Sequence, residues 1–237
     1  MRKLIAYISI SCLAILLSSF TGLPRISGNE LTLAMYAAPV INDISAKADL
    51  EYEQLDLDQK GLSKQAFEYA YKGYAYLLEK ELISKPDYLT ICDFSQSSKQ
   101  KRLYIIDLAR DTVLLNTYVA HGHNSGGEFA TRFSNRPASR QSSLGFYITK
   151  DTYSGEHGLS LRVDGLEAGF NDRAYRRAIV IHGADYIGDG SIGRSYGCPA
   201  VPLKESKMII NTIKNGTCLF IYHPQKKYLQ NSKILND

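Results

Sequence analysis

The residues best suited to chemistry in this chain are one cysteine and one histidine in its second half. Cys198 lies in the segment Gly193-Arg-Ser-Tyr-Gly-Cys-Pro-Ala-Val201, where Gly and Pro predict a turn rather than a strand. His182 ends an apolar, strand-like run and precedes Gly183, so its ring is expected at a strand end. A nucleophilic cysteine needs a base to form its thiolate. The pattern therefore predicts nucleophilic catalysis by Cys198, with His182 as the base.

Attack on a carbonyl group also needs donors for the developing oxyanion. Gly197 lets the backbone approach a substrate closely, and the N–H groups of Gly197 and Cys198 are the predicted donors. Pro199 has no N–H and is excluded. For His182 alone, the alternative is a hydrogen-bonded histidine at a strand end. A catalytic Cys198 is expected to have a pKa lowered by its histidine, whereas a non-catalytic one keeps a value of about 8.5.

Other titratable residues offer weaker alternatives. His121 and His123 can share a metal ion, but no further Cys or His pair joins them at a suitable spacing, so we predict neither a metal nor a cofactor. Asp185 can orient His182 or stabilise its own turn, and a backbone carbonyl can orient the ring equally well. His157 precedes another predicted strand, where it either lines a cleft or caps the strand.

The N-terminus predicts export. Arg2 and Lys3 precede the apolar run Leu4–Leu17, and small residues follow up to Gly22, as in a secretory signal. A membrane anchor is the alternative, but the run is shorter than the roughly 20 apolar residues that a spanning helix needs. We therefore expect a signal peptide over residues 1–22, no stable membrane span after its removal, and a mature protein in the periplasm or cell envelope.

Cysteine use agrees with a single reactive thiol. Removal of Cys12 with the leader leaves Cys92, Cys198 and Cys218, an odd number in a compartment where thiols are normally paired. Cys92 and Cys218 lie in strand-like apolar runs, where a cysteine usually packs as a small core residue. Cys198 is therefore the candidate reactive thiol.

Composition excludes several classes of protein. The chain has 237 residues, of which 44% are hydrophobic and 22% charged, so it is neither disordered nor collagen-like. The net charge of +4 is scattered, and the tightest basic group is Arg173, Arg176 and Arg177. This is not the footprint of a nucleic-acid-binding protein, and we expect no nucleic-acid partner.

The sequence pattern changes from helical to mainly β near residue 86. Residues 31–82 have helical character, with Ser63 as a cap. We expect the apolar stripe of this segment to be packing surface. The pair Lys85-Pro86 is predicted to end the helix. The remainder is mainly β, with short helices. Predicted strands are Tyr88–Phe94, Arg102–Leu108, Thr112–Val119, Leu144–Thr149, Leu159–Val163, Ala178–Ile181 and Cys218–Tyr222, and predicted helices are Glu167–Arg177 and Lys204–Lys214. The polar stretch His121–Gln141 is expected to be a loop beside a binding site.

These motifs together resemble the YkuD-type L,D-transpeptidases, in particular the branch of murein L,D-transpeptidase catalytic domain proteins. The resemblance runs from about Tyr104 to Tyr222. The elements that carry it, in order, are Ser143-Leu-Gly-Phe-Tyr147, His182-Gly183, Ser195-Tyr-Gly-Cys-Pro-Ala-Val201 and Gly216-Thr217. It implies a mixed β-sandwich or barrel-like catalytic fold with an N-terminal helical segment, and it implies Cys198 as nucleophile and His182 as general base.

The chain also departs from the commonest pattern of that family. Tyr196 stands where the family has a histidine, and Ala200 and Val201 stand where it has an arginine shortly after the cysteine. We expect Arg194 to pair with a carboxylate of a stem peptide in place of the missing arginine, with an exposed loop arginine as the alternative. The full set of predicted substrate-binding residues is Gly183, Arg194, Ser195 and Tyr196.

The resemblance implies an enzyme that cross-links peptidoglycan stem peptides through a cysteine thioester and that carbapenems acylate. An L,D-carboxypeptidase with the same site is one alternative, and a non-catalytic cell-wall-binding module, suggested by Tyr196, is another. A sortase-like enzyme fits less well, because sortases rely on an arginine after the cysteine in another strand. The expected divisions are a signal peptide (1–22), an N-terminal helical segment (30–85), a catalytic domain (86–224) and a solvated tail (225–237).

Overall fold

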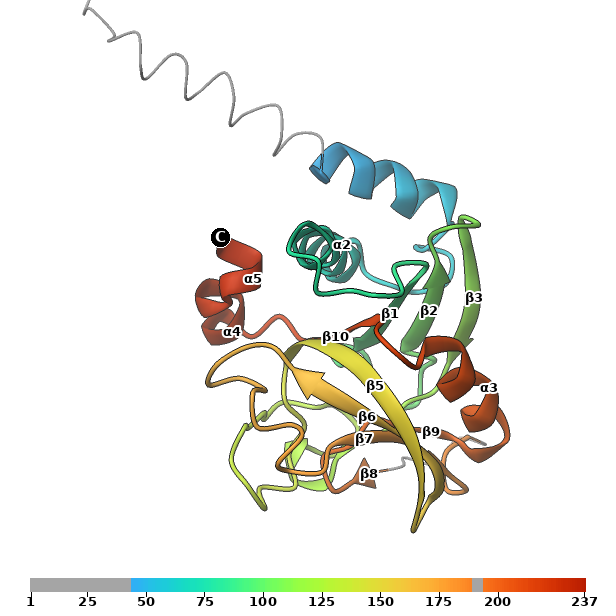
Figure 1. Cartoon of the computed structure of the whole chain (residues 1–237), viewed down its shortest axis with the longest axis vertical. Coiled ribbons are helices and arrows are strands. Elements are labelled where there is room, and N and C mark those ends of the chain that lie inside the picture. The colour runs from blue at the N-terminus through green and yellow to red at the C-terminus, as the bar shows by residue number, and fades with distance from the viewer. Residues whose placement is uncertain (1–43, 189–193) are drawn as a thin grey trace, which may run out of the picture. The chain divides into compact units, whose positions relative to one another are not determined.

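The computed structural model describes residues 44–188 and 194–237 (Figure 1). Clustering of contacts divides the chain at Pro39 and Val40, so all described residues belong to the second unit. The expected signal peptide lies outside the described residues, as does the start of the N-terminal helical segment. The helices in the described part of the chain include none long and apolar enough to cross a membrane.

The described unit is mainly β, as predicted. Its strands are β1 (Tyr88–Asp93), β2 (Leu103–Asp107), β3 (Thr112–Thr117), β4 (His121–Gly122), β5 (Gly145–Gly155), β6 (Gly158–Gly165), β7 (Val180–Ala184), β8 (Arg194–Ser195), β9 (Ala200–Pro202) and β10 (Cys218–Tyr222). Residues 44–54 are helical, followed by α2 (Lys64–Glu79), η1 (His123–Ser125), α3 (Leu203–Ile213), α4 (Lys226–Asn231) and α5 (Lys233–Asn236).

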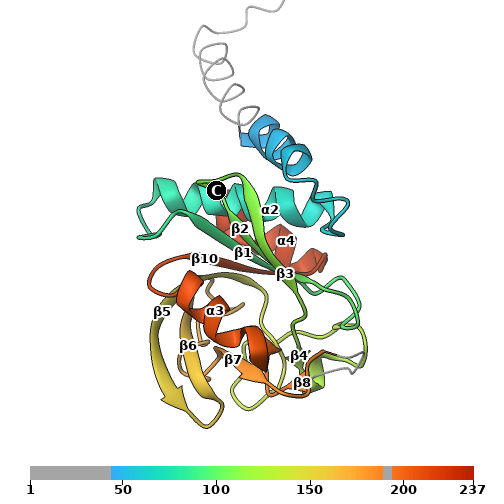
Figure 2. The ribbon, with the colours of Figure 1, turned by 90° about the vertical axis from the view of Figure 1, so that its right-hand side faces the viewer.

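One sheet organises the unit. Its strand order is β3-β2-β1-β10-β5-β6-β7-β9, and β4 pairs separately with β8. The pairs β1/β10 and β7/β9 are parallel and the other pairs of the large sheet are antiparallel. Helix α2 contacts β1 and β10, whereas α3 contacts β6, β7 and β9 (Figures 1 and 2). Strand β7, which carries His182, and strand β9, which follows Cys198, therefore lie together at one end of the sheet.

All seven predicted strands are present. The largest difference is at β5, which continues to Gly155 because Lys150 and the following polar residues form an exposed hairpin with β6. The residues from Gly145 to Thr149 are all buried, and exposed residues begin at Lys150, where the pairing register shifts. A pattern based on apolar residues therefore ended the strand too early.

Helix α2 confirms the predicted cap and packing stripe. The Ser63 side chain accepts the N–H of Ala66, and buried residues such as Phe67 and Leu77 share one core with the sheet. Gly73 permits close approach, because a Cβ atom there would lie 1.9 Å from the Phe146 ring. This core includes residues on both sides of the expected boundary at residues 85 and 86.

The predicted end of this helix at Lys85-Pro86 is too late. The helix ends at Glu79, where the N–H of Leu82 binds the carbonyl of Leu77 and Glu81 takes a φ of 55°. This is the hydrogen-bond pattern of a Schellman cap, with Glu81 in the place that glycine usually occupies. The absence of glycine hid the end from sequence analysis.

The predicted helix Glu167–Arg177 is wrong, since residues 167–178 form turns. Gly169 has a φ of 82°, which an α-helix cannot accommodate. The Asn171 side chain also accepts the N–H of Glu167 at 2.8 Å and donates to the carbonyl of Phe146. Local side-chain bonds thus replace the helical ladder. By contrast, the predicted helix Lys204–Lys214 is confirmed as α3.

The predicted solvated tail at residues 225–237 is also wrong. Tyr228, Ile234 and Leu235 are buried, and Tyr228 and Ser232 donate hydrogen bonds to the carboxyl group of Glu167. The lysines of this segment concealed its apolar residues in the sequence. Helices α4 and α5 are therefore part of the folded unit.

Candidate functional site

Cys198 lies in a sharp bend between β8 and β9. The Ser195 hydroxyl accepts the N–H of Gly197 at 3.1 Å and donates to the carbonyl of Cys198. Gly197 has a φ of 123°, and a Cβ atom at this position would lie 2.9 Å from the carbonyl oxygen of Gln141. Only glycine fits both conditions. The bend therefore holds the cysteine between two strands, as the sequence predicts.

The Cys198 thiol is half-buried. Its sulfur donates to the carbonyl of Ala178 at 3.7 Å. Burial raises its pKa, while a hydrogen bond from the Val180 backbone and the charge of Arg177 lower it in part. Burial raises the pKa of Tyr186, and the negative charges of a Cys198 thiolate and of Asp185 raise it further. The direction of the Cys198 shift is opposite to the lowered pKa expected from the sequence, and it favours a neutral thiol at rest.

His182 is buried on β7 and points one nitrogen at the backbone. Its Nδ1 lies 3.0 Å from the carbonyl oxygen of Gly183. A carbonyl only accepts, so Nδ1 carries the proton and Nε2 has the lone pair. The ring stacks on His157 with centroids 4.3 Å apart. Burial, and to a lesser extent His157, lower the pKa of His182 and keep it neutral.

This geometry shows what orients the ring of His182 and what packs against it. The hydrogen bonds of the described residues include none between Asp185 and His182, and a backbone carbonyl orients the ring instead. His157 stacks directly on His182. It therefore contacts the predicted base.

Strand pairing brings the two predicted catalytic residues to neighbouring segments. In the parallel pair β7/β9, His182 lies opposite Ala200, two residues after Cys198. Two residues correspond to about 7 Å of strand. Among the described residues, no hydrogen bond joins the thiol to the imidazole. The arrangement places a thiol and a neutral base on adjacent segments.

Only one of the two predicted oxyanion donors is available in this arrangement. The N–H of Gly197 is already donated to Ser195. The N–H of Cys198 makes no hydrogen bond with any residue that the structure describes. Gly197 was predicted to donate its N–H to the oxyanion, but that N–H is already used in this hydrogen bond.

The predicted substrate-binding residues lie in different surroundings. Ser195 is buried and shapes the bend, and Gly183 packs against α3, where a Cβ atom would lie 2.7 Å from Ser206 Oγ. Tyr196 is 73% exposed, with the Arg140 guanidinium 4.6 Å from its ring centre. Arg194 is exposed on β8. Ser195 and Gly183 therefore have structural contacts, whereas Tyr196 and Arg194 remain accessible.

Sequence analysis missed Arg177 as a site residue. Its guanidinium donates to the carbonyls of Ser134 and Gln141, at 2.7 and 2.6 Å, and to the Ser143 hydroxyl at 2.5 Å. One of its nitrogens lies 3.4 Å from the position of a Cβ atom on Gly197. Arg177 thus links the 134–143 segment to the bend of Cys198. The basic cluster Arg173, Arg176 and Arg177 was the signal in the sequence.

The remaining predictions, for His121 and for the cysteines Cys92 and Cys218, concern residues in the interior. His121 is buried, and its Nδ1 accepts from Arg102 at 2.8 Å. Burial and the charge of Arg102 lower the pKa of His121 to about 4. Cys92 and Cys218 are buried and unpaired, which confirms them as core residues. Within the described residues, no group of three His, Cys, Asp or Glu side chains is arranged to hold a metal ion.

Comparison with known proteins identifies a family. A family model described as an L,D-transpeptidase catalytic domain matches residues 58–222, well over half of the chain. Its range includes the second half of the expected N-terminal helical segment and stops before α4. A search of curated proteins found no match to this chain.

Solved structures of L,D-transpeptidases are similar to this chain at low identity. One from Mycobacterium smegmatis is 11% identical, with a TM-score of 0.37 and coverage of 58% of this chain and 59% of that one. The C442S mutant of the Enterococcus faecium enzyme is 13% identical, with a TM-score of 0.35 and coverage of 57% and 50%. An L,D-transpeptidase in complex with imipenem is 10% identical, with a TM-score of 0.36 and coverage of 57% and 59%. The chain thus spans less than two thirds of each of these proteins.

Proposed function

Because this chain belongs to the L,D-transpeptidase catalytic domain family, we propose that it is a cysteine acyltransferase that cross-links the stem peptides of peptidoglycan. The observation that supports this most strongly is the pairing of β7 with β9. It brings His182, whose Nε2 has the lone pair, beside the bend that carries Cys198. The predicted leader indicates that the enzyme acts in the periplasm or cell envelope.

In the proposed reaction, the sulfur of Cys198 attacks the carbonyl carbon of an L,D peptide bond between a diamino acid and a terminal D-Ala. Nε2 of His182 takes the thiol proton as the C–S bond forms, then gives it to the leaving amine of D-Ala. A thioester remains on Cys198. The amine of a second stem then attacks the thioester, and the cross-link forms as the thiol is regenerated.

Two groups assist this sequence. The N–H of Cys198, which makes no hydrogen bond with the described residues, is the proposed donor to the oxyanion. The guanidinium of Arg177 is held by four hydrogen bonds to the 134–143 segment, and its charge favours the thiolate against the cost of burial. Because hydrogen bonds at catalytic sites often tighten only with substrate bound, the thiol is proposed to leave the Ala178 carbonyl when a stem binds.

The thiol chemistry also leads us to propose acylation by carbapenems. A strained lactam carbonyl offers the same target as the peptide carbonyl, and ring opening leaves the acyl group on sulfur. Intact mass of the protein after incubation with a carbapenem measures this directly. A single adduct that is absent in Cys198→Ala is the expected result.

A non-catalytic wall-binding module is the second candidate. It is favoured by the raised pKa of Cys198 and by the exposed Tyr196 in the place of the usual histidine. Such a module binds stems but releases no D-Ala. Its binding is therefore independent of the thiol.

The test is incubation of the purified protein with disaccharide tetrapeptide, followed by mass spectrometry of the products. Cys198→Ala is expected to reduce D-Ala release by at least about 10³-fold, whereas the control Cys92→Ala removes a buried thiol and retains turnover. Dimeric products indicate transpeptidation, and tripeptide alone indicates an L,D-carboxypeptidase. Equal turnover by Cys198→Ala would contradict the proposal, and binding without any turnover would favour the wall-binding module.

A further inference from the structure

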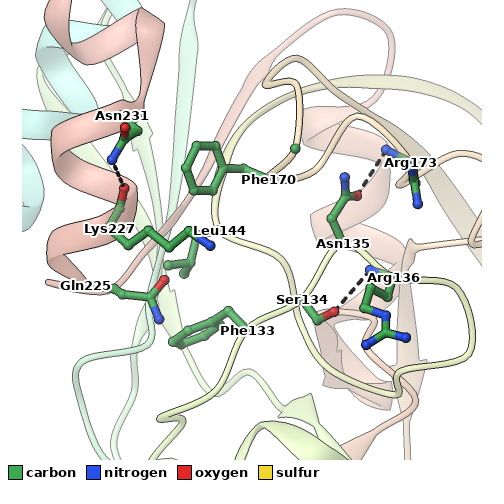
Figure 3. Close-up of a pocket in the computed structure, with 11 residues that line it drawn as sticks. Phe133, Ser134, Asn135, Arg136, Leu144, Phe170, Arg173, Gln225, Lys227 and Asn231 are labelled. Carbon is green, nitrogen blue, oxygen red and sulfur yellow. Dashed lines mark hydrogen bonds between the residues drawn. The ribbon is translucent and has the colours of Figure 1, made fainter.

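A cavity whose lining does not include the Cys198 bend opens between the 133–136 segment, the turns after Gly165 and α4 (Figure 3). Its volume is about 610 Å³, within the range of sites that hold small molecules. Neither Cys198 nor His182 lines it. Its apolar lining comes from Phe133, Leu144 and Phe170, and its charged lining from Arg136, Arg173 and Lys227.

All the charged side chains that line this cavity are positive. Three cationic side chains line it, and no carboxylate does. Arg136, Arg173 and Lys227 form no ion pair with any residue in the described part of the chain. Lys227 points between the rings of Phe133 and Phe170, and the two arginines lie on the opposite wall (Figure 3). The cavity therefore concentrates positive charge around an apolar floor.

The backbone that carries the arginines is held in place. The N–H of Arg173 donates to the Asn135 side chain at 3.1 Å, and the N–H of Arg136 donates to the Ser134 hydroxyl at 3.0 Å. The nearby carboxylate of Asp172 is occupied by the Asn135 amide, at 2.6 Å, and by the N–H of Gly169. Asp172 thus supports the wall, and among the described residues it forms no ion pair with either arginine.

Two contacts connect this cavity to the Cys198 bend. The carbonyl of Ser134, on the cavity wall, accepts from the guanidinium of Arg177 at 2.7 Å. The N–H of Arg177 also binds the carbonyl of Arg173 at 2.9 Å. One turn therefore directs Arg177 toward Cys198 and Arg173 toward the cavity. The α4 wall, with Lys227, lies outside the residues that the family model matches.

We propose that this cavity binds the free carboxylate of an acidic peptide, specifically a peptidoglycan stem held beside the catalytic bend. Guanidinium groups bind carboxylates through paired, charge-assisted hydrogen bonds. The apolar floor accommodates the aliphatic part of such a peptide. The identity of the peptide rests on the proposed function, whereas the preference for a carboxylate rests on the three unpaired cations.

The test compares two ligands on the full chain carrying Cys198→Ala, which prevents turnover. Calorimetric titration with disaccharide tetrapeptide is compared with titration of the same compound in which every carboxylate is a carboxamide. Loss of one charge-assisted hydrogen-bond pair is expected to weaken binding about tenfold. Adding Arg136→Gln and Arg173→Gln should abolish the difference between the ligands. Arg176→Gln, an exposed arginine of the same turn that does not line the cavity, should preserve it.

Equal affinity of the acid and the amide would overturn the proposal, as would an equal loss of affinity in the Arg176→Gln control. A kinetic measurement separates this proposal from the proposed function. In the chain with Cys198 intact, the double arginine variant should raise KM for D-Ala release and leave kcat unchanged. Turnover with an unchanged KM would overturn the cavity proposal alone, whereas charge-dependent binding without any turnover would overturn the enzymatic function alone.

Discussion

Two buried histidines, His121 on β4 and His182 on β7, have similar local sequences and opposite hydrogen bonding. Each lies on a strand and precedes a glycine. Nδ1 of His121 faces the guanidinium of Arg102, which only donates, so Nδ1 accepts and Nε2 carries the proton toward Gly126. Nδ1 of His182 faces a carbonyl, so the lone pair is on Nε2. The partner of Nδ1, rather than the His-Gly pair, decides which histidine can act as a base.

The residues around the two histidines lead to the same distinction between them. Arg102 is itself buried, donates to the Val119 and Gln96 carbonyls, and stacks on Phe94. His121 completes this buried cluster, and its lone pair is used. His182 stacks on His157, and its Nε2 makes no hydrogen bond with any residue that the structure describes. The lone pair of His121 is therefore used within the fold, whereas that of His182 is not used by any described residue.

The largest expected contrast is in activity. His182→Gln should lower kcat for D-Ala release by about 10²–10⁴-fold, because it removes the general base. His121→Gln should leave kcat per folded molecule within a few-fold, since His121 does not face the thiol. Turnover is measured by mass spectrometry of released D-Ala, with the folded fraction determined by circular dichroism. Equal losses of kcat in the two variants would contradict the distinction between the two histidines.

The next contrast is in stability at acid pH. The folded-state pKa of His121 is about 4, below the unfolded value of about 6.5. The unfolded chain therefore binds more protons in this range, and stability is lost as pH falls from about 6.5 to 4. His121 accounts for up to about 3 kcal/mol of this loss. Urea unfolding across this range should show a shallower decline for His121→Gln.

The matched control for this measurement is His123→Gln. His123 is exposed and two residues away, so its replacement should leave the pH dependence of the unfolding free energy unchanged. A decline in His121→Gln as steep as that of the unsubstituted protein would show that His121 is not held neutral by the Arg102 cluster.

The smallest effect concerns Arg177 and sharpens the account of the thiol. Arg177→Gln removes the charge that partly offsets burial, so the pKa of Cys198 should rise and alkylation by iodoacetamide near neutral pH should slow roughly threefold. Arg177→Lys should retain part of the rate, because the charge remains. Arg176→Gln is the control, and an equal slowing in that variant would exclude a specific effect of Arg177.

Local patterns predicted the strands and the core cysteines well. Cys218 begins an apolar run of β-branched and aromatic residues bounded by polar turns, and β10 has the predicted ends. The bend at Cys198 was predictable because Gly197 and Pro199 restrict the backbone locally. The prediction that Cys198 and His182 act together came from the turn at Cys198 and the strand end at His182, as well as from the family resemblance. The pairing of β7 with β9 puts the two residues on neighbouring segments.

Features that depend on distant partners were not predictable. Tyr228 and Ser232 appeared solvent-exposed in a lysine-rich tail because their partner, Glu167, lies more than sixty residues away. The same carboxyl group anchors the turns that replace a predicted helix. Arg177 acquires its role only when the 134–143 segment folds around it. Each of these errors traces to a buried polar contact between remote residues.

The most direct test of the central claim is to locate the acyl group on the protein. Rapid mixing with disaccharide tetrapeptide, acid quenching and peptide mapping by tandem mass spectrometry would identify the modified residue. The account predicts a thioester on Cys198 that accumulates without an acceptor stem and is absent in His182→Gln, but present in His121→Gln. Turnover without an adduct on Cys198, or an adduct that forms equally well in His182→Gln, would contradict it.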